Sequence, residues 1–572
     1  MKHGIRRVPA LWRATRLARR WYHARRGAYP DWSRLTPAES STWDEARRAA
    51  QGGRRVLMAT SIGSYAHAVT LESALAAALT FRGAEVHALL CDAALTACAE
   101  CEASLYPDLQ AFAVSGPSKD LCRDCRWPAE RVYEQLGLRV HRFSDWLTAA
   151  DRDDARAAAS GLALADIPTF TRDGVAIGEH AYAGALRFFA TGSIEDEPQG
   201  EAVLRRYLES ALLTTAVTRR LCREVGFESA VFTHGIYVPW GLIGESARRE
   251  GVRVVTWNVA YRKRRFVFSH DDTYHHTLLT EPRDRWEHLE LSPAQEQELM
   301  QYLASRREGL FDWIVFHRPR RDDPRELAKT LGLDPARPTI GLLTNVSWDA
   351  QLHYPANAFP NMLEWLVCTC EYFATRPDLQ LLIRVHPAEI SGFPPSRQPI
   401  LAELARRIPS LAPNIFVVGP ENPMSTYALM SLCNAAIIYG TKMGVELTSV
   451  GQPVIVAGEA WIRNKGLTYD ASSRDQYLAL LARLPFASGL DQDQLARARR
   501  YAYHFFFNRM IPLPFIEPKA GYPIYRLKLE RLEQLRPGAS QGLDTLCDGV
   551  LSGAPFVLRN SPAAGPGSTS TP

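Results

Sequence analysis

The chain lacks long apolar runs. None of its 572 residues belongs to a stretch of roughly 18 consecutive apolar residues, the length from which a membrane-spanning helix is inferred. The opening residues also lack the apolar core of a signal peptide. The sequence therefore predicts a cytoplasmic protein with no export signal.

Net charge is also small, with 67 Lys and Arg against 62 Asp and Glu. This balance points to no nucleic-acid partner. Residues 1–26 nevertheless hold nine Lys or Arg and no acid, interleaved with aromatic and aliphatic side chains. Residues 12–26 predict either a basic amphipathic helix on an anionic membrane, at its inner face, or a disordered basic arm.

A metal-binding Asp-x-Asp element at the end of a strand is missing. The two Asp-x-Asp runs, at 151–153 and 491–493, fall in polar helical sequence. We therefore expect no catalytic divalent metal, with positive groups and helix dipoles stabilising a leaving phosphate instead.

Cysteines are few, ten in all, but four of them form two C-x2-C pairs separated by twenty residues. Such spacing is typical of a structural zinc site with four thiolate ligands, here on a cysteine-rich loop inserted after the second strand. An iron–sulfur cluster uses the same ligands and stays an alternative. The predicted ligands are Cys98, Cys101, Cys122 and Cys125.

Two regions alternate apolar strands with helices. The first has predicted strands at 55–60, 85–90, 229–233 and 253–257, and the second at 339–344, 379–385, 415–418, 435–439 and 453–457. Short apolar strands separated by helices predict parallel sheets of the doubly wound α/β class, which bind ligands at the carboxyl ends of their strands.

This pattern divides the chain into six predicted parts. They are a basic, partly helical arm (1–53), an N-terminal Rossmann-like domain (54–282), a helical connector (283–337), a C-terminal Rossmann-like domain (338–485), closing helices (486–551) and a disordered tail (552–572).

The candidate ligand-binding residues follow strands of the second region. Arg384 and His386 lie at the end of one strand, where an imidazole can donate to a phosphate oxygen. Another strand ends in a glycine-containing turn, 440–444, of the kind that approaches phosphate closely. Its Lys442 adds positive charge, and Glu446 is placed to hold ribose hydroxyls.

These motifs carry a resemblance. The runs RVHP, ENPMSTYALM and YGTKMGVELTSVGQPVIVAGEAWIRNKGLTYDA resemble the C-terminal half of GT-B glycosyltransferases of bacterial capsule and surface-polysaccharide biosynthesis. They are also similar to Kdo transferases and, more distantly, to sugar-nucleotide 2-epimerases. The resemblance covers residues 338–485 best. It implies two Rossmann-like domains facing a cleft, a nucleotide-sugar donor, and a glycan or lipid-linked acceptor.

The resemblance also implies roles for single residues. His386 contacts the donor phosphates, Ser425 and Tyr427 the nucleotide, and Gly440 and Thr441 with Glu446 the phosphate and ribose. Many relatives read Ser-Thr or Ser-Gly where this chain has Tyr439-Gly440-Thr441.

Three residues are candidates for the general base that deprotonates an acceptor hydroxyl: His234, His67 and Asp349. His234 leads, because it lies with Gly235 at a strand end, and the base is expected in the N-terminal half. The leading function is a glycosyltransferase acting on a surface-polysaccharide acceptor. Two alternatives stay open, a sugar-nucleotide 2-epimerase and a non-catalytic subunit of polysaccharide assembly.

Overall fold

The computed structural model describes residues 28–106, 108–307, 311–313, 323–349, 356–392 and 394–558 of the 572-residue chain. The predicted basic segment 12–26 and most of the predicted disordered tail lie outside these residues. No helix in the described ranges is long and apolar enough to cross a membrane.

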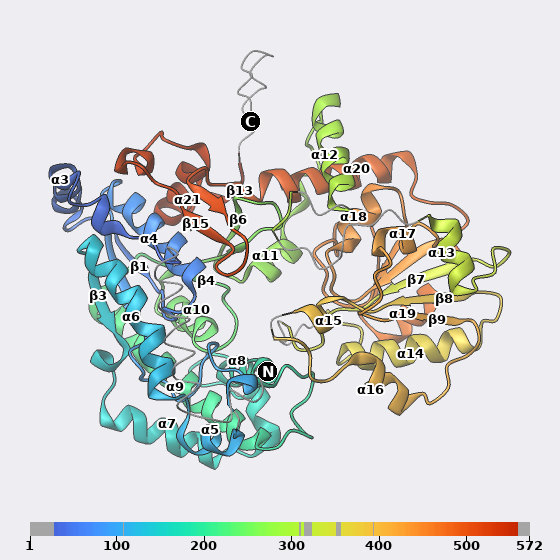
Figure 1. Cartoon of the computed structure of the whole chain (residues 1–572), viewed down its shortest axis with the longest axis horizontal. Coiled ribbons are helices and arrows are strands. Elements are labelled where there is room, and N and C mark those ends of the chain that lie inside the picture. Colours follow the sequence, from blue (N-terminus) through green and yellow to red (C-terminus); the bar gives the residue numbers. More distant parts are fainter. Residues whose placement is uncertain are drawn as a thin grey trace.

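The described chain is a mixed α/β structure built on two separate sheets of mainly parallel strands (Figure 1). We call each sheet with its helices a unit. The N-terminal unit lies on the left of Figure 1 and the C-terminal unit on the right.

The sheet of the N-terminal unit has seven described strands in the order β13-β6-β5-β4-β1-β2-β3. The strands β1 to β5 are parallel, and β6 and β13 add antiparallel pairs at one edge. Their bounds are β1 Arg55–Met58, β2 Glu85–Leu90, β3 Arg139–Arg142, β4 Ser229–Thr233, β5 Arg253–Val259, β6 Arg265–His270 and β13 Ile511–Pro512.

Helices cover both faces of this sheet. The helix α4 (Ala66–Thr80) is apolar all round, with fourteen of its fifteen residues buried, as expected of a helix between a sheet and a second helical layer. The others are α3 Ser40–Ala50, α5 Leu109–Ser115, α6 Lys119–Leu136, α7 Ala149–Gly161, α8 Ile177–Phe189, α9 Gly200–Val225, α10 Trp240–Arg249, α11 Tyr274–Thr280 and α21 Gln541–Ser552.

The sheet of the C-terminal unit has six described strands, all parallel, in the order β12-β11-β10-β7-β8-β9. Counted from β7, this is the strand order 3-2-1-4-5-6 of doubly wound folds. The bounds are β7 Thr339–Leu343, β8 Gln380–Arg384, β9 Ile415–Val418, β10 Ala435–Ile438, β11 Val454–Val456 and β12 Tyr469–Asp470.

The helices of this unit are mostly short. They are α13 Pro324–Leu331, α14 Met362–Ala374, α15 Ala388–Ser391, α16 Ile400–Arg407, α17 Thr426–Met430, α18 Met443–Ser449 and α19 Arg474–Leu481. Every residue of β7, β8 and β10 is buried, because helices cover both faces of a parallel sheet. The nine strands predicted from apolar runs in both regions are confirmed.

The chain crosses twice between the units. The predicted connector contains α12 (Pro293–Arg306), and α20 (Gln492–Tyr503) lies beside it at the top of Figure 1. Beyond α20 the chain returns to the N-terminal unit, where β13 pairs with β6 and α21 packs against α4. The hairpin of β14 (Ile516–Pro518) and β15 (Tyr525–Leu527) lies between them. The predicted closing helices are therefore only partly helical.

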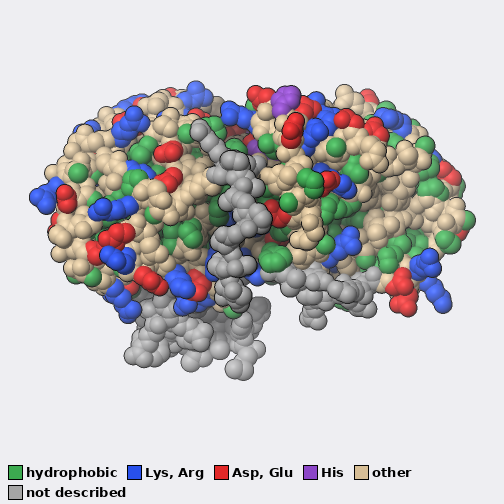
Figure 2. All heavy atoms as spheres, turned by 90° about the horizontal axis from the view of Figure 1, so that it is seen from above, with side chains coloured by type: hydrophobic (Ala, Val, Ile, Leu, Met, Phe, Trp, Pro, Cys, Tyr) green, Lys and Arg blue, Asp and Glu red, His purple; other side chains and the backbone are tan. Residues whose placement is uncertain are grey.

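Acidic and basic side chains are mixed over the face shown in Figure 2. No large patch of one sign covers the described atoms of this face. That distribution agrees with the small net charge of the sequence.

Candidate functional site

A cavity of about 280 Å³ lies at the carboxyl ends of the strands of the C-terminal unit. Residues that follow β7, β8 and β10 line it. The strand order reverses between β7 and β10, and crevices at such a switch point are the usual ligand sites of open α/β sheets. Three residues of the N-terminal unit, Tyr261, Tyr274 and His275, line its other side.

His386, the second residue after β8, lies at the predicted strand end and is among the residues that line this cavity. Its Nδ1 accepts a hydrogen bond of 3.1 Å from the Ala388 N–H, so the neutral ring carries its proton on Nε2. Burial, followed by the charges of Lys442 and Arg384, lowers the pKa of His386 to about 4. At neutral pH the residue is therefore a neutral N–H donor.

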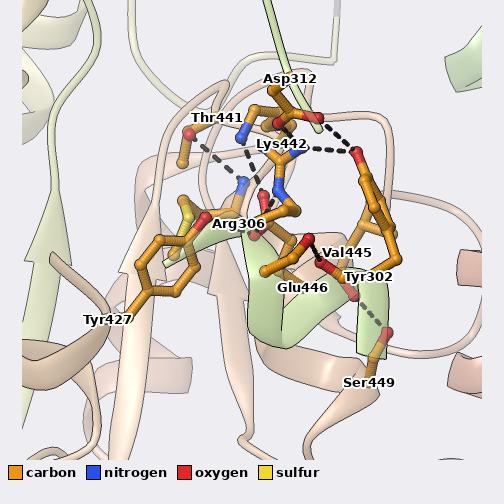
Figure 3. A network of polar contacts seen from close by, with 11 residues as sticks. Tyr302, Arg306, Asp312, Tyr427, Thr441, Lys442, Val445, Glu446 and Ser449 are labelled. Atoms are coloured by element: carbon orange, nitrogen blue, oxygen red, sulfur yellow. Dashed lines mark hydrogen bonds and ion pairs between the residues drawn. The ribbon is translucent and has the colours of Figure 1, made fainter. Parts of the chain in front are cut away.

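Lys442 also lines the cavity, and a buried network of charges holds its ammonium group (Figure 3). Lys442 Nζ donates to Glu446 Oε1 at 2.8 Å, and Arg306 Nε donates to Glu446 Oε2 at 3.0 Å. Tyr427 donates its hydroxyl proton to the same carboxylate at 2.7 Å. The Lys442 ammonium lies 4.6 Å from the ring centre of Tyr261, close enough for a cation–π contact.

A second carboxylate balances the second cation of the network. Arg306 Nη1 donates to Asp312 and to the Tyr302 hydroxyl, and Tyr302 donates to Asp312 at 2.9 Å. Arg306, Asp312 and Glu446 are each no more than 5% exposed. Buried charges are tolerated when they are paired and hydrogen-bonded in this way.

The network fixes the charge states of its members. Burial pushes the pKa of Glu446 up, but Arg306 and Lys442 outweigh it and bring the pKa down to about 2. Burial and the charge of Arg306 lower the pKa of Lys442, against the opposing effect of Glu446. Glu446 is thus an ionised anchor for two cations.

Glu446 does not line the cavity, and both of its oxygens accept bonds from the protein. This placement does not favour its predicted contact with ribose. Tyr427 and Lys442 face the cavity instead, and Glu446 holds both from below.

The guanidinium group of Arg384 is also engaged in hydrogen bonds within the protein. It donates to the backbone carbonyls of Gly419 and Asn422 and approaches the Thr426 hydroxyl. It therefore fixes the segment between β9 and α17, although part of it lines the cavity. Ser425 is buried at the start of α17 and is not a lining residue, whereas its neighbour Thr426 is.

The glycine turn after β10 lies where it was predicted. Gly440 and Thr441 both line the cavity, and the Gly440 N–H donates to Asn345 Oδ1 at 3.4 Å. Thr441 Oγ1 accepts from the Met443 N–H at 3.3 Å, and the hydroxyl can still donate its own proton. Asn345, from the end of β7, ties the two sides of the switch point together.

Sequence reasoning missed the aromatic wall of the cavity. Tyr274 and His275 contact each other and Trp461 of the C-terminal unit, with ring centres 4.2 to 6.0 Å apart. Tyr261 lies 6.1 Å from Trp461. Such faces pack against a sugar or a base. No signal in the sequence separated these rings from ordinary core aromatics.

The three predicted base candidates occupy different places. Asp349 lines the cavity and accepts a hydrogen bond of 3.3 Å from the Tyr237 hydroxyl of the N-terminal unit. His234 follows β4, and its ring lies 6.1 Å from that of Tyr274. Burial, followed by the charges of His275 and Arg187, lowers the pKa of His234 to about 3.

His67 lies in α4, away from the lining of the cavity. The rings of Tyr522 and Tyr525, from the returning C-terminal segment, are 6.1 and 6.4 Å from it. Burial lowers its pKa to about 4. This placement favours His67 least of the three as a base.

Three of the four predicted zinc ligands, Cys98, Cys122 and Cys125, line one small pocket, but the side chains are not arranged as a metal site. No set of three or more His, Cys, Asp or Glu side chains is placed to hold a metal ion in the described part of the chain. Cys98 and Cys101 have sulfur atoms 3.9 Å apart. Cys122 and Cys125, however, lie on the continuous helix α6, not on the predicted irregular loop. The zinc site therefore stays a prediction.

No protein family matches this chain, and no curated protein does. Among solved structures, Thermosulfurimonas dismutans KpsC, beta Kdo 2,4 transferase, is 15% identical over 49% of this chain and 81% of that chain, with a TM-score of 0.32. CalG4, the calicheamicin glycosyltransferase, is 13% identical over 78% and 93%, with a TM-score of 0.25. UDP-GlcNAc 2-epimerase from Neisseria meningitidis bound to UDP-GlcNAc is 8% identical over 78% and 97%, with a TM-score of 0.21. Likenesses this low identify no activity.

Proposed function

We propose that the chain is a glycosyltransferase that takes its sugar from a nucleotide-sugar donor held at the switch point of the C-terminal unit. One observation carries this proposal. The neutral N–H donor His386, the ammonium of Lys442 and the Thr441 hydroxyl line one cavity at the ends of β8 and β10. Donors and a cation that converge at this edge suit a phosphate group.

The same side chains supply what sugar transfer requires at the leaving group. Negative charge develops on the departing phosphate as the glycosidic bond breaks, and fixed donors in a water-poor site stabilise it strongly. Lys442 is held for this task by Glu446, and His386 donates through Nε2. We propose that these groups act without a catalytic divalent metal.

Asp349 is the proposed general base. Of the three candidates it is the one among the lining residues, and a carboxylate at the acceptor side can remove the proton of an attacking hydroxyl. Asp349→Asn is expected to lower kcat by about 10²- to 10⁴-fold with little change in nucleotide affinity. A loss of nucleotide binding instead would place Asp349 on the donor side.

The test of the main proposal uses binding first and turnover second. The purified chain is titrated with a panel of nucleotide sugars, with Tm as the readout, and donor consumption is then measured with and without glycan acceptors. Acceptor-independent epimerisation would show an epimerase instead. A chain that binds no nucleotide, with His386→Ala equal to the unchanged protein, would favour a non-catalytic assembly subunit.

We further propose a surface-polysaccharide or lipid-linked acceptor reached at the inner face of the membrane. The support is the basic composition of residues 1–26. The fraction of protein that sediments with vesicles containing an anionic lipid should fall when these residues are removed. The truncated protein should then sediment with anionic and neutral vesicles to the same extent. If the full chain and the chain without residues 1–26 sediment with anionic vesicles equally well, these residues do not bind the membrane.

The zinc proposal has its own test. Metal content is measured in the unchanged protein and in Cys98→Ser, with Cys433→Ser, far from the two pairs in sequence, as the matched control. Stoichiometric zinc that is lost only in Cys98→Ser supports the site. Equal metal content in both variants would remove it.

A further inference from the structure

The N-terminal unit has a switch point of its own. Its strand order reverses between β1 and β4, so the residues after these strands border the place where a doubly wound sheet accepts a ligand. The turn after β4 is strained, because His234 and Tyr237 adopt positive φ angles of 70° and 68°. Non-glycine residues adopt such angles at a cost in free energy, and residues with these angles gather at functional sites.

Arg187, in the last turn of α8, lies beside this turn. Its guanidinium carbon is 5.8 Å from the ring centre of Tyr237. Tyr237 is in turn bonded to Asp349, which lines the donor cavity. The charge of Arg187 is also felt by His234. Arg187 is thus linked to the cavity through Tyr237 and Asp349, although it is not itself a lining residue.

The guanidinium of Arg187 has no carboxylate partner within 4.0 Å among the described residues. Its hydrogen bonds there go to the Ala99 carbonyl at 2.7 Å and to the Tyr65 hydroxyl at 3.0 Å. Glu102 contributes at longer range only. The positive charge of this largely buried group is therefore held by two neutral acceptors and nearby tyrosines, and is not paired with a carboxylate.

Other arginines of the molecule differ from Arg187 in their partners or in their position. Arg306 and Arg219 are paired with carboxylates. Arg206, on α9, donates to the carbonyls of Ala113 and Val114 and fixes the end of α5. Arg206 therefore has a structural task remote from the cavity, whereas Arg187 sits at a switch point beside a strained turn.

We propose that Arg187, with Tyr65 and His234 beside it, forms a subsite for an anionic group, a carboxylate or a phosphate, on the acceptor. The proposal rests on the proposed transferase function and names the class of acceptor. A planar guanidinium binds either anion through two parallel hydrogen bonds. The neutral imidazole of His234 and the Tyr65 hydroxyl are placed to bind sugar hydroxyls next to it.

Binding to sugars that differ only in charge tests this subsite. Glucuronate and glucose 6-phosphate are titrated calorimetrically into the unchanged chain, beside neutral glucose and inorganic phosphate. We expect the two anionic sugars to bind and glucose to bind at least tenfold more weakly. Inorganic phosphate equal to glucose 6-phosphate would show a site for free phosphate and would overturn the acceptor subsite.

The variants separate this subsite from the donor cavity. Arg187→Gln should lower the affinity for the anionic sugars at least tenfold, and Arg187→Lys should lower it less. The control Arg206→Gln should leave this affinity unchanged. Lys442→Gln, which removes the ammonium of the donor side, should leave their binding in place. Circular dichroism and Tm show that each variant is folded. Anionic sugars that bind Arg187→Gln as they bind the unchanged chain would overturn the proposal.

Nucleotide binding distinguishes the two possible failures. Arg187→Gln should bind the panel of nucleotide sugars with unchanged affinity. If the unchanged chain binds nucleotides but no anionic sugar, the subsite fails and the proposed function stands. If it binds no nucleotide, the proposed function fails.

Discussion

Glu446 joins two parts of the chain that are 140 residues apart, because it accepts from Arg306 of α12 and from Lys442 of the turn after β10. At the scale of single residues, this carboxylate supplies negative charge that balances the positive charges of Arg306 and Lys442. Its role is thus to fix the position and charge of groups that face the cavity, and it needs no ligand contact of its own.

Replacing this carboxylate is expected to be costly. Glu446→Gln leaves Arg306 and Lys442 buried with one negative charge fewer, and breaking a buried pair in this way costs about 3–5 kcal/mol. The midpoint of urea unfolding measures the loss. The exposed pair of Glu517 with Arg526 offers the control, since Glu517→Gln should leave the midpoint unchanged. Equal midpoints for both variants would contradict the structural role of Glu446.

Glu72 gives a prediction of pH dependence. It is 1% exposed and accepts from Thr60 and from the Trp257 ring at 2.5 and 2.9 Å. Burial raises its pKa from 4.5 to about 7. Because the folded state holds its proton more tightly, the stabilisation is complete below pH 4.5 and is lost as the pH rises through 7.

The neutral analogue should remove that loss. Glu72→Gln is expected to have nearly the same Tm as the unchanged chain at pH 4.5 and a higher Tm at pH 8. Tm is measured at both pH values by differential scanning calorimetry. A difference in Tm that does not grow with pH would mean that Glu72 is not protonated in the folded chain.

Residue roles were harder to predict than residue positions. The sequence placed His386, Thr441 and Lys442 correctly at strand ends, because apolar runs and glycine turns mark where strands stop. The sequence could not show that the side chains of Glu446 and Arg384 form hydrogen bonds within the protein and are not available to a ligand. Their partners, Arg306 and the carbonyls after β9, are far away in the sequence.

At the scale of elements, the segment between β9 and α17 depends on one side chain. Arg384 donates to the half-buried carbonyls of Gly419 and Asn422, and the Gly419 carbonyl also accepts from the Asn422 N–H. Arg384→Gln is expected to loosen this segment at a cost of about 1–3 kcal/mol. Hydrogen exchange of residues 419–426 should become faster.

A matched comparison keeps that prediction specific. Arg376 also donates to a carbonyl, that of Leu484, but pairs with Asp378 on the surface. Arg376→Gln should leave exchange in residues 419–426 as it is. Unchanged exchange in Arg384→Gln would show that the segment is held by other contacts.

The predictable elements were the buried parallel strands. Their continuous apolar runs are typical of strands covered on both faces. The strands β3, β6 and β13 were missed for a shared reason. The first and last are short, and β3 and β6 carry charged or polar ends, so no apolar run stands out. An edge strand such as β13 is identified by its partner, not by its own sequence.

At the scale of the whole molecule, the N-terminal unit is made of two separate stretches of chain. The last 50 or so described residues supply β13, the β14–β15 hairpin and α21. The side chains of Leu543, Leu546 and Val550 are almost fully buried in the core of that unit. The two units are therefore not separable by a single cut.

Truncation tests this arrangement. A chain ending at Asn508 should lose cooperative unfolding of the N-terminal unit and aggregate, because the apolar surface of α4 and β6 is exposed. A chain ending at Leu558 keeps every described element and serves as the control. Size-exclusion chromatography and calorimetry compare the two. A monomeric, cooperatively folded chain ending at Asn508 would refute the prediction.

The return of β13 to β6 has a consequence for synthesis on the ribosome. About 240 residues separate the two strands, and at roughly 5–20 residues per second their translation takes on the order of ten seconds to a minute. Throughout that interval β6 is an open edge of a nearly finished sheet, and such edges recruit other chains. The edge of β6 therefore stays unpaired until β13 has been made, and the nascent chain is a natural client for chaperones during that interval.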